Sequence, residues 1–277
     1  MIWLFIIIAV VVFAVVAARR MGFFPKNHAL GGQDTEGYVR ILMYHKFTEN
    51  RTETDFLTIT AGDFEEQIKH AQSIGFQFIT SRQLAEFYAF GKPLPPRPLL
   101  VTFDDAYCSQ LEIAAPILRK HAACATVFVP TKYVGTGSNW DGQNAAPILS
   151  AEELKQLDPS LFELALHTHA HVNYKNLPLA DIERDVDDCL AFFDNHKMPF
   201  APTFSYAYGG RPKNRKILRG LKKYFAERNI LLAFRIGNRI NSLKINDLYE
   251  LQRIDVRGDE SFEIFKKKLN FGRVKLF

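Results

Sequence analysis

Short apolar runs alternate with amphipathic segments along most of the chain, and this alternation limits the possible folds more than any other feature. The apolar runs are nearly continuous, which is typical of strands buried on both faces. Between them, apolar residues recur at helical spacing, as in Phe64, Ile68 and Ala71. The predicted strands are 39–44, 76–79, 99–103, 125–129, 162–166, 203–207, 231–234 and 248–254, and the predicted helices lie near 60–75, 81–90, 109–121, 150–157, 179–195, 213–226 and 260–269. This order predicts a parallel sheet covered by helices, either open or closed.

Polar residues follow directly after several predicted strands. They are His45, Asp104, Asp105, His167 and Tyr208. A (β/α) barrel carries its active site at the carboxyl ends of its strands, and side chains contributed by several strands at once favour the closed form. With 277 residues, of which 47% are apolar, we expect one large domain over residues 38–277.

Two adjacent carboxylates, Asp104 and Asp105, end the apolar run 99–103. Carboxylates in a half-buried site are costly unless a cation or hydrogen bonds compensate them. Adjacent side chains at a strand end point in different directions, so that one can bind a metal while the other faces a water molecule. Taken alone, two adjacent aspartates are more simply explained as a turn or helix-capping pair.

Three of the eight histidines lie within five residues, at His167, His169 and His171. A helical or tightly turned segment would place His167 and His171 on one side and direct His169 elsewhere. Two imidazoles and one carboxylate form an open metal site, as zinc hydrolases require. The alternative is a surface cluster without function.

Aromatic residues and two glycines lie at the end of the predicted strand 203–207. In Tyr206-Ala207-Tyr208-Gly209-Gly210, the glycines permit close approach of the backbone to a ligand, and a backbone N–H there could stabilise an oxyanion. An ordinary turn fits this segment equally well. Trp140, in a loop rich in glycine and asparagine, is expected to pack on the barrel rim rather than against a sugar.

In this order and spacing, the three features resemble the motifs of the polysaccharide deacetylase family, also called the NodB-homology or carbohydrate esterase family 4 group. Residues 102–107 resemble its first motif, TFDDG(Y/F), residues 167–171 resemble H(S/T)xxH, and residues 204–209 resemble the third motif. Further similarity lies in residues 41–45, 148–157 and 249–256, so that the resemblance covers about residues 38–272.

The resemblance implies a distorted (β/α) barrel and a metal-dependent hydrolase that removes an N-acetyl or other N-acyl group from an amino sugar. Asp105, His167 and His171 would bind a divalent metal, usually zinc. Asp104 would be the general base toward the attacking water, and the oxyanion would be held by the metal and the Tyr208 backbone N–H.

The chain departs from the family pattern at four places. Ala106 replaces the usual glycine, Ala207 stands where a proline is common, and Ser205 stands where many members carry an arginine that orients the base. The usual proton donor is a late histidine, yet no histidine follows His196. Tyr44-His45 resembles a variant in which an early histidine fills that place. His45 is therefore the expected proton donor; a position far from the metal would favour a catalytically inactive, carbohydrate-binding relative.

The first residues form an apolar run, 2–18, closed by Arg19 and Arg20. This run predicts a single-pass membrane anchor at residues 1–20, followed by a linker at 21–37, with a cleaved signal peptide as the alternative. The positive-inside rule favours a cytoplasmic domain, but two arginines leave the side of the membrane open.

The remaining composition limits the partners. The net charge is +5, but no nucleic-acid-binding motif accompanies the basic residues, so we expect no nucleic acid partner. Three cysteines without CxxC spacing indicate neither a disulfide framework nor a thiolate metal site. The resemblance, together with the predicted anchor, implies an N-acetylated polysaccharide or a lipid-linked amino sugar as the substrate.

Overall fold

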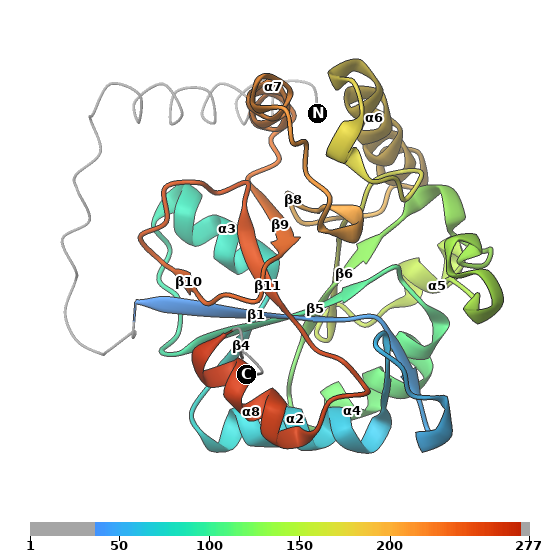
Figure 1. Ribbon diagram of the computed structural model, residues 1–277, viewed down its shortest axis with the longest axis vertical. Helices are drawn as coiled ribbons and strands as arrows, with labels where there is room; N and C mark the ends of the chain where they lie inside the picture. The colour runs from blue at the N-terminus through green and yellow to red at the C-terminus, as the bar shows by residue number, and fades with distance from the viewer. Residues whose placement is uncertain (1–36, 273–277) are drawn as a thin grey trace. The chain divides into compact units, whose positions relative to one another are not determined.

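The computed structural model describes residues 37–272, and within them seven parallel strands form a closed barrel (Figure 1). The ring closes because β1 pairs with β5 through the register Arg40↔Leu99 to Tyr44↔Phe103. In order around the ring, the strands are β1 (Tyr38–Tyr44), β11 (Leu251–Asp255), β9 (Leu232–Ile236), β8 (Thr203–Ser205), β7 (Phe162–Leu166), β6 (Ala125–Val129) and β5 (Pro98–Asp104). The predicted barrel is therefore confirmed, and it is closed.

Four short strands lie outside this ring. β4 (Gln77–Ile79) extends the sheet beside the start of β5, and β10 (Asn241–Ser242) runs antiparallel to the start of β1. β2 (Lys46–Thr48) and β3 (Thr58–Thr60) form a separate parallel pair. The sequence did not predict β2, β3 or β10, because none of these short segments is an apolar run.

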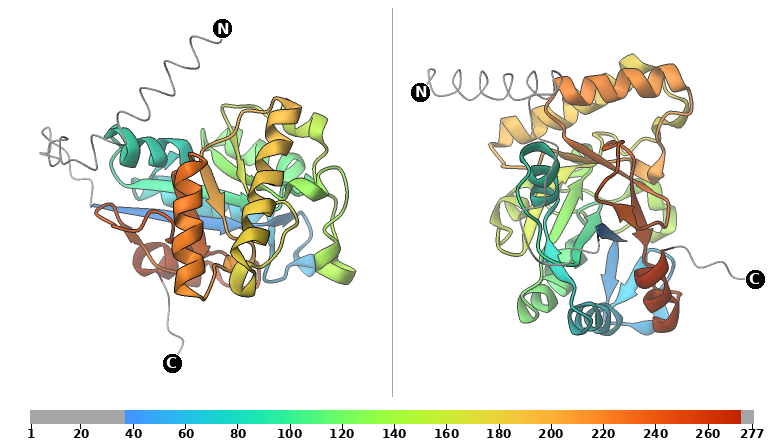
Figure 2. Two further views of the ribbon diagram at one scale, coloured as in Figure 1. Left: turned by 90° about the horizontal axis from the view of Figure 1, so that it is seen from above. Right: turned by 90° about the vertical axis from the view of Figure 1, so that its left-hand side faces the viewer.

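Helices cover the outside of the barrel. In the view of Figure 1, α2 (Ala61–Ser73), α4 (Ala115–Lys120) and α8 (Phe262–Phe271) lie below the strands, whereas α6 (Leu179–His196) and α7 (Arg215–Glu227) lie above them. Figure 2 shows α6 and α7 side by side, where Arg228 bonds Asp187. The other helices are α3 (Ser81–Phe90), α5 (Ala151–Gln156), the π-helical turn η2 (Gln110–Ala114) and the 3-10 helices η1 (Arg51–Glu53), η3 (Thr131–Tyr133), η4 (Asn139–Asn144), η5 (Tyr174–Asn176) and η6 (Ala207–Gly209).

Local capping fixes where these helices begin. The predicted capping pair at the start of α2 is present, since Thr60 Oγ1 accepts a bond from the Asp63 N–H at 3.0 Å. Thr80 and Ser150 form full capping boxes with Gln83 and Glu153 at the starts of α3 and α5.

Alternate residues of each ring strand point into the barrel. Phe128 of β6 and Phe234 of β9 meet across its interior at a ring separation of 5.6 Å, although two strands lie between them in the ring. Leu100, Ala165 and Leu251 belong to the same interior cluster. Since side chains alternate with a period of two, the next inward positions toward the carboxyl ends include Asp104, His167 and Arg253. The pleat of the strands thus places these polar residues inside the mouth of the barrel.

At the opposite, amino-terminal end, α3 closes the barrel. Ser81 Oγ bonds Glu163 Oε2 at 2.9 Å and Thr203 Oγ1 at 2.8 Å, and the Ser81 N–H donates to Thr126 Oγ1 at 3.0 Å. The three strands β6, β7 and β8 are therefore joined to α3 by hydrogen bonds close to their first residues.

The predicted anchor at residues 1–20 and the predicted linker as far as residue 36 lie outside the described residues. Within the part of the chain from residue 37 to residue 272, no helix combines the length and the apolar character needed to cross a bilayer.

Candidate metal centre and active site

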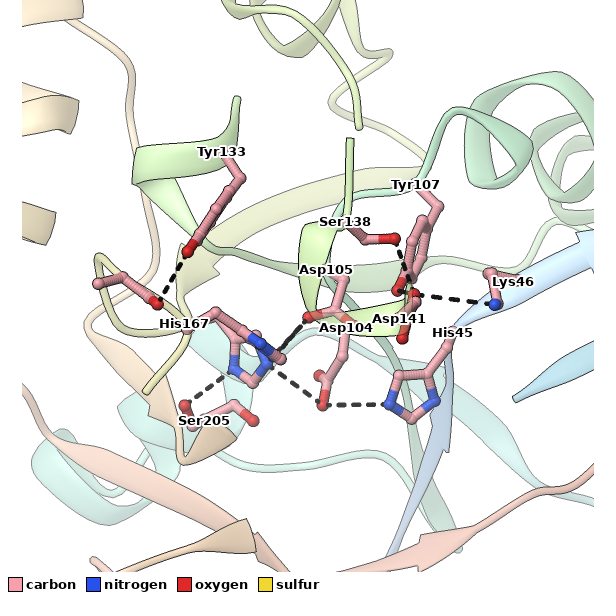
Figure 3. A network of polar contacts seen from close by, with 12 residues as sticks. His45, Lys46, Asp104, Asp105, Tyr107, Tyr133, Ser138, Asp141, His167 and Ser205 are labelled. Atoms are coloured by element: carbon pink, nitrogen blue, oxygen red, sulfur yellow. Dashed lines mark hydrogen bonds and ion pairs between the residues drawn. The ribbon is translucent and has the colours of Figure 1, made fainter. Parts of the chain in front are cut away.

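Three side chains that follow the carboxyl ends of β5 and β7 converge on one point. Figure 3 shows two of them, Asp105 and His167, directed toward each other. Asp105 Oδ1 lies 3.3 Å from His167 Nε2 and 3.1 Å from His171 Nε2. One potential ligand atom from each of the three residues lies within 4.8 Å of the others, and all three side chains are buried. The structure therefore brings together the three metal ligands that the resemblance implies.

The hydrogen bonds of this group fit a bound cation. His167 Nδ1 lies 2.9 Å from the Ser205 carbonyl oxygen, which can only accept, so the proton belongs on Nδ1 and the Nε2 lone pair faces Asp105. Asp105 Oδ1 is buried and has no hydrogen-bond partner among the described residues. A buried carboxylate oxygen without a donor is costly, and a divalent metal bound by two imidazoles and one carboxylate removes that cost.

Neighbouring charges shift the pKa values of His167 and Asp105 in opposite directions. Burial lowers the pKa of His167, but the carboxylates of Asp104 and Asp105 outweigh it and raise the pKa above its ordinary value. Burial alone would raise the pKa of Asp105, but the two imidazoles hold it well below its usual range. A proton and a metal ion therefore compete for the same site.

The backbone at this site adopts a conformation that side chains rarely take. The φ angles are positive at Asp105 (71°), Ala106 (52°), Thr168 (61°), His171 (49°) and Tyr208 (57°). This explains the glycine that the family usually carries at position 106, since only glycine takes a positive φ without cost. Such conformations persist where the surrounding structure enforces them, and they cluster at active sites.

The turn that carries the two histidines is held from α6. Asp185 accepts bonds from the backbone N–H groups of His169 at 2.9 Å and Ala170 at 2.8 Å, and from the Tyr174 hydroxyl at 2.6 Å. The His169 ring contacts Thr131 Oγ1 instead of the metal group. The segment is therefore a tight turn rather than a helix, and it separates His167 and His171 from His169.

Asp104 faces Arg253, a residue that the sequence did not assign to the site. The guanidinium donates two bonds of 2.6 Å, one to each carboxylate oxygen, and the Arg253 side chain is fully buried. Burial alone would raise the pKa of Asp104, but the Arg253 charge outweighs it and lowers that pKa, so Asp104 is ionised at neutral pH. Arg253 thus supplies from β11 the charge that the family pattern places at position 205. The sequence indicated Arg253 only indirectly, because it lies in residues 249–256, one of the segments that resemble the family.

His45 lies on the other side of Asp104, at the end of β1. Its Nε2 atom is 3.9 Å from Asp104 Oδ2, and its buried Nδ1 has no hydrogen-bond partner among the described residues. His45 is therefore beside the candidate base, and it lines the same cavity as the three candidate metal ligands.

Trp140 covers the metal group from the loop before α5. Its indole stacks on the His171 ring with centroids 3.8 Å apart, and its edge meets Tyr133 at 4.7 Å. The neighbouring Asp141 accepts bonds from the Tyr107 hydroxyl at 2.6 Å and the Ser138 hydroxyl at 2.7 Å (Figure 3). Trp140 therefore packs on a candidate metal ligand and lines the same cavity as the metal group.

A cavity of about 520 Å³ opens beside the metal group. It contains every residue that the sequence proposed for the site, namely His45, Asp104, Asp105, His167, His171 and Tyr208. Phe56 and Tyr208 line it as well, with 53% and 54% of their surface exposed, respectively.

A model of the family described as polysaccharide deacetylase matches residues 91–225, which include Asp104, Asp105 and the three-histidine turn. Over this segment the chain matches the polysaccharide deacetylase family. Among curated members, the poly-beta-1,6-N-acetyl-D-glucosamine N-deacetylase of Staphylococcus aureus is 28% identical over 172 residues, covering 59% of this chain and 58% of that protein. The match therefore spans somewhat more than half the length of that relative.

Solved structures of deacetylases share the fold of this chain. The Streptococcus pyogenes deacetylase PplD, in complex with acetate, superposes with a TM-score of 0.67 at 21% identity, over 84% of this chain and 98% of that one. IcaB from Ammonifex degensii gives a TM-score of 0.67 at 22% identity, over 84% and 96% of the two chains. At these identities the likeness establishes the NodB-type barrel.

Proposed function

We propose that this protein is a metal-dependent deacetylase that removes the N-acetyl group from an amino sugar of a glycan or a lipid-linked saccharide. The observation that carries the proposal is the position of Asp104. Its carboxylate is fixed by Arg253, and its Oδ2 lies 3.8 Å from His167 Nε2 and 3.9 Å from His45 Nε2. A fixed, ionised carboxylate between a candidate metal ligand and a candidate proton donor is the arrangement that amide hydrolysis needs.

Asp105, His167 and His171 would hold the metal, and their donor set of one oxygen and two nitrogens suits zinc. When bound, the ion would lower the pKa of water and polarise the acyl oxygen. Asp104 takes the proton of the attacking water, while Arg253 keeps this base ionised and oriented. His45 donates a proton to the leaving amine, and the backbone N–H of Tyr208 donates to the developing oxyanion. The products are acetate and a free amino sugar.

The mouth of the cavity supports a sugar substrate. Phe56 and Tyr208 expose their rings there, and aromatic faces pack well against the apolar faces of pyranose rings. The Staphylococcus aureus relative is named for poly-beta-1,6-N-acetyl-D-glucosamine, which makes β-1,6-linked N-acetylglucosamine oligomers the first substrates to test.

The test measures acetate released from such oligomers. We expect release to stop after chelation and to return with added Zn²⁺. We expect Asp104→Asn to lower the rate by about 10²–10⁴-fold with the metal still bound, as for loss of a general base. Asp187→Asn, on the exposed α6–α7 pair, serves as a charge-matched control. Glycan binding without acetate release would instead identify a carbohydrate-binding relative.

We further propose that residues 2–18 tether the enzyme to a membrane. A reporter fused to the carboxyl terminus would identify the side on which the domain lies. A cytoplasmic domain would favour a lipid-linked sugar, because exported polysaccharide would be out of its reach. An external domain would favour the polysaccharide, and release of the domain into the medium after cleavage would contradict the tether.

A further inference from the structure

One buried side chain connects the strand ends that carry the candidate base and the candidate proton donor. Gln110 Nε2 donates to the carbonyl oxygen of His45 at 2.9 Å and to that of Asp104 at 2.6 Å. The Gln110 side chain is 1% exposed. The β1–β5 ladder ends at the pair Tyr44↔Phe103, so the two carbonyls belong to the first residues beyond it.

The position of Gln110 depends on an unusual helix start. It is the first residue of the π-helical turn η2, and the residue before it, Ser109, accepts a bond from the Phe47 N–H at 3.0 Å. A π turn holds one residue more than an α turn, and such turns are frequent at functional sites. Two successive residues of this segment therefore attach the start of η2 to the chain that follows β1.

The side chains of the two catalytic candidates are held unequally. Asp104 is fixed by two bonds from Arg253. His45 has no such support, because its Nδ1 lacks a hydrogen-bond partner among the described residues and its Nε2 is 3.9 Å from the nearest carboxylate oxygen of Asp104. The place of the His45 ring is therefore set chiefly by its backbone, which Gln110 fixes.

We propose that Gln110 is a positioning residue, which sets the distance between the proton acceptor Asp104 and the proton donor His45 by bridging their carbonyl groups. This inference rests on the proposed function. Gln110 touches neither reacting side chain, and neither of its bonds goes to a metal ligand. Displacement of a catalytic group by about 1 Å lowers the rate by roughly 100-fold, so loss of the bridge affects turnover rather than binding.

The test compares Gln110→Met with Gln67→Met. Gln67 is a second buried glutamine, on α2, whose Oε1 accepts a bond from the Tyr44 hydroxyl at 2.8 Å. Both substitutions remove a buried amide beside β1, but only one removes the bridge. We expect Gln110→Met to lower kcat by roughly 10- to 100-fold, with KM and zinc content within threefold of wild type. Gln67→Met should keep kcat within threefold.

An unchanged kcat in Gln110→Met, a loss explained by lost zinc, or an equal kcat loss in Gln67→Met would each overturn the proposal. Gln110→Asn is the second variant, since its shorter amide reaches at most one carbonyl; it should lower kcat by a smaller factor. If neither Gln110 variant folds while Gln67→Met does, Gln110 is a folding residue and the positioning role is wrong.

A crystal structure of Gln110→Met separates this inference from the proposed function. The distance between His45 Nε2 and Asp104 Oδ2 should exceed the 3.9 Å seen here. If wild type releases no acetate but this distance increases, the proposed function fails and the positioning role stands. An unchanged distance with unchanged activity rejects the positioning role alone.

Discussion

Both ends of the barrel bury polar groups, but within the described residues these groups are hydrogen-bonded at the amino end, whereas several lack partners at the carboxyl end. At the amino end, Ser81 of α3 forms hydrogen bonds with three strand residues, Thr126, Glu163 and Thr203. Thr126 also donates to Glu163. At the carboxyl end, Asp105 Oδ1, His45 Nδ1, His171 Nδ1 and Ser205 Oγ are buried without a hydrogen-bond partner among the described residues.

The difference is instructive because the same strands contribute to both ends. On β7, Glu163 points inward at the amino end, and His167, the residue after the strand, points inward at the carboxyl end. On β8, Thr203 and Ser205 occupy the corresponding two positions. Buried polar groups are normally satisfied, so a cluster of unsatisfied ones indicates a site for an ion or a ligand. The amino end is thus expected to contribute stability, and the carboxyl end is expected to contribute binding and chemistry.

The largest effect is expected at the metal group. His167→Ala removes one of three ligands and should reduce zinc content and acetate release to background, while the fold persists. Metal analysis and circular dichroism of the purified protein check both parts. His169→Ala is the matched control, because His169 lies in the same turn but contacts Thr131. Equal zinc loss in both variants would show that the turn, rather than the ligand, was damaged.

A smaller effect is expected at the buried ion pair between Arg253 and Asp104. Arg253→Met leaves the buried Asp104 carboxylate without its countercharge, which should lower the free energy of unfolding by roughly 3–5 kcal/mol. Chemical denaturation measures this loss. Arg228→Met, at an exposed pair with Asp187, should cost less than about 1 kcal/mol. Equal losses in the two variants would contradict the role given to burial.

The smallest effect is expected at the amino end. Ser81→Ala leaves Thr203 and Glu163 short of a partner and should lower the free energy of unfolding by about 1–3 kcal/mol. Acetate release per folded molecule should stay unchanged, since this end is remote from the cavity. A loss of activity without a loss of stability would break the division of roles between the two ends.

Much of the fold was predictable from local patterns. The apolar runs located the ring strands to within a few residues, because strands of a closed parallel barrel are apolar on both faces. β2 and β3 carried no such signal, because each has a single apolar residue between two polar ones. The helix predicted at 109–121 is a π turn followed by α4, and helical spacing cannot distinguish the two types.

The candidate site was predictable where its residues adjoin strand ends and match family motifs. Arg253 escaped because it lies inside a strand rather than at its end, and it meets Asp104 from 149 residues away, a contact that depends on how the ring closes. Gln110 escaped because a single glutamine in a helix carries no signal by itself. Both act through contacts that only the barrel register creates.

The closure of the ring between β1 and β11 also has a consequence for biosynthesis. β11 ends at Asp255, so nearly the whole chain must leave the ribosome before the gap between the first strand and the last can be filled. Contacts so distant in sequence form slowly, and unpaired strand edges of incomplete chains attract aggregation. A nascent chain that stops before residue 253 would hold the candidate base without its countercharge, so premature catalysis during synthesis is not expected.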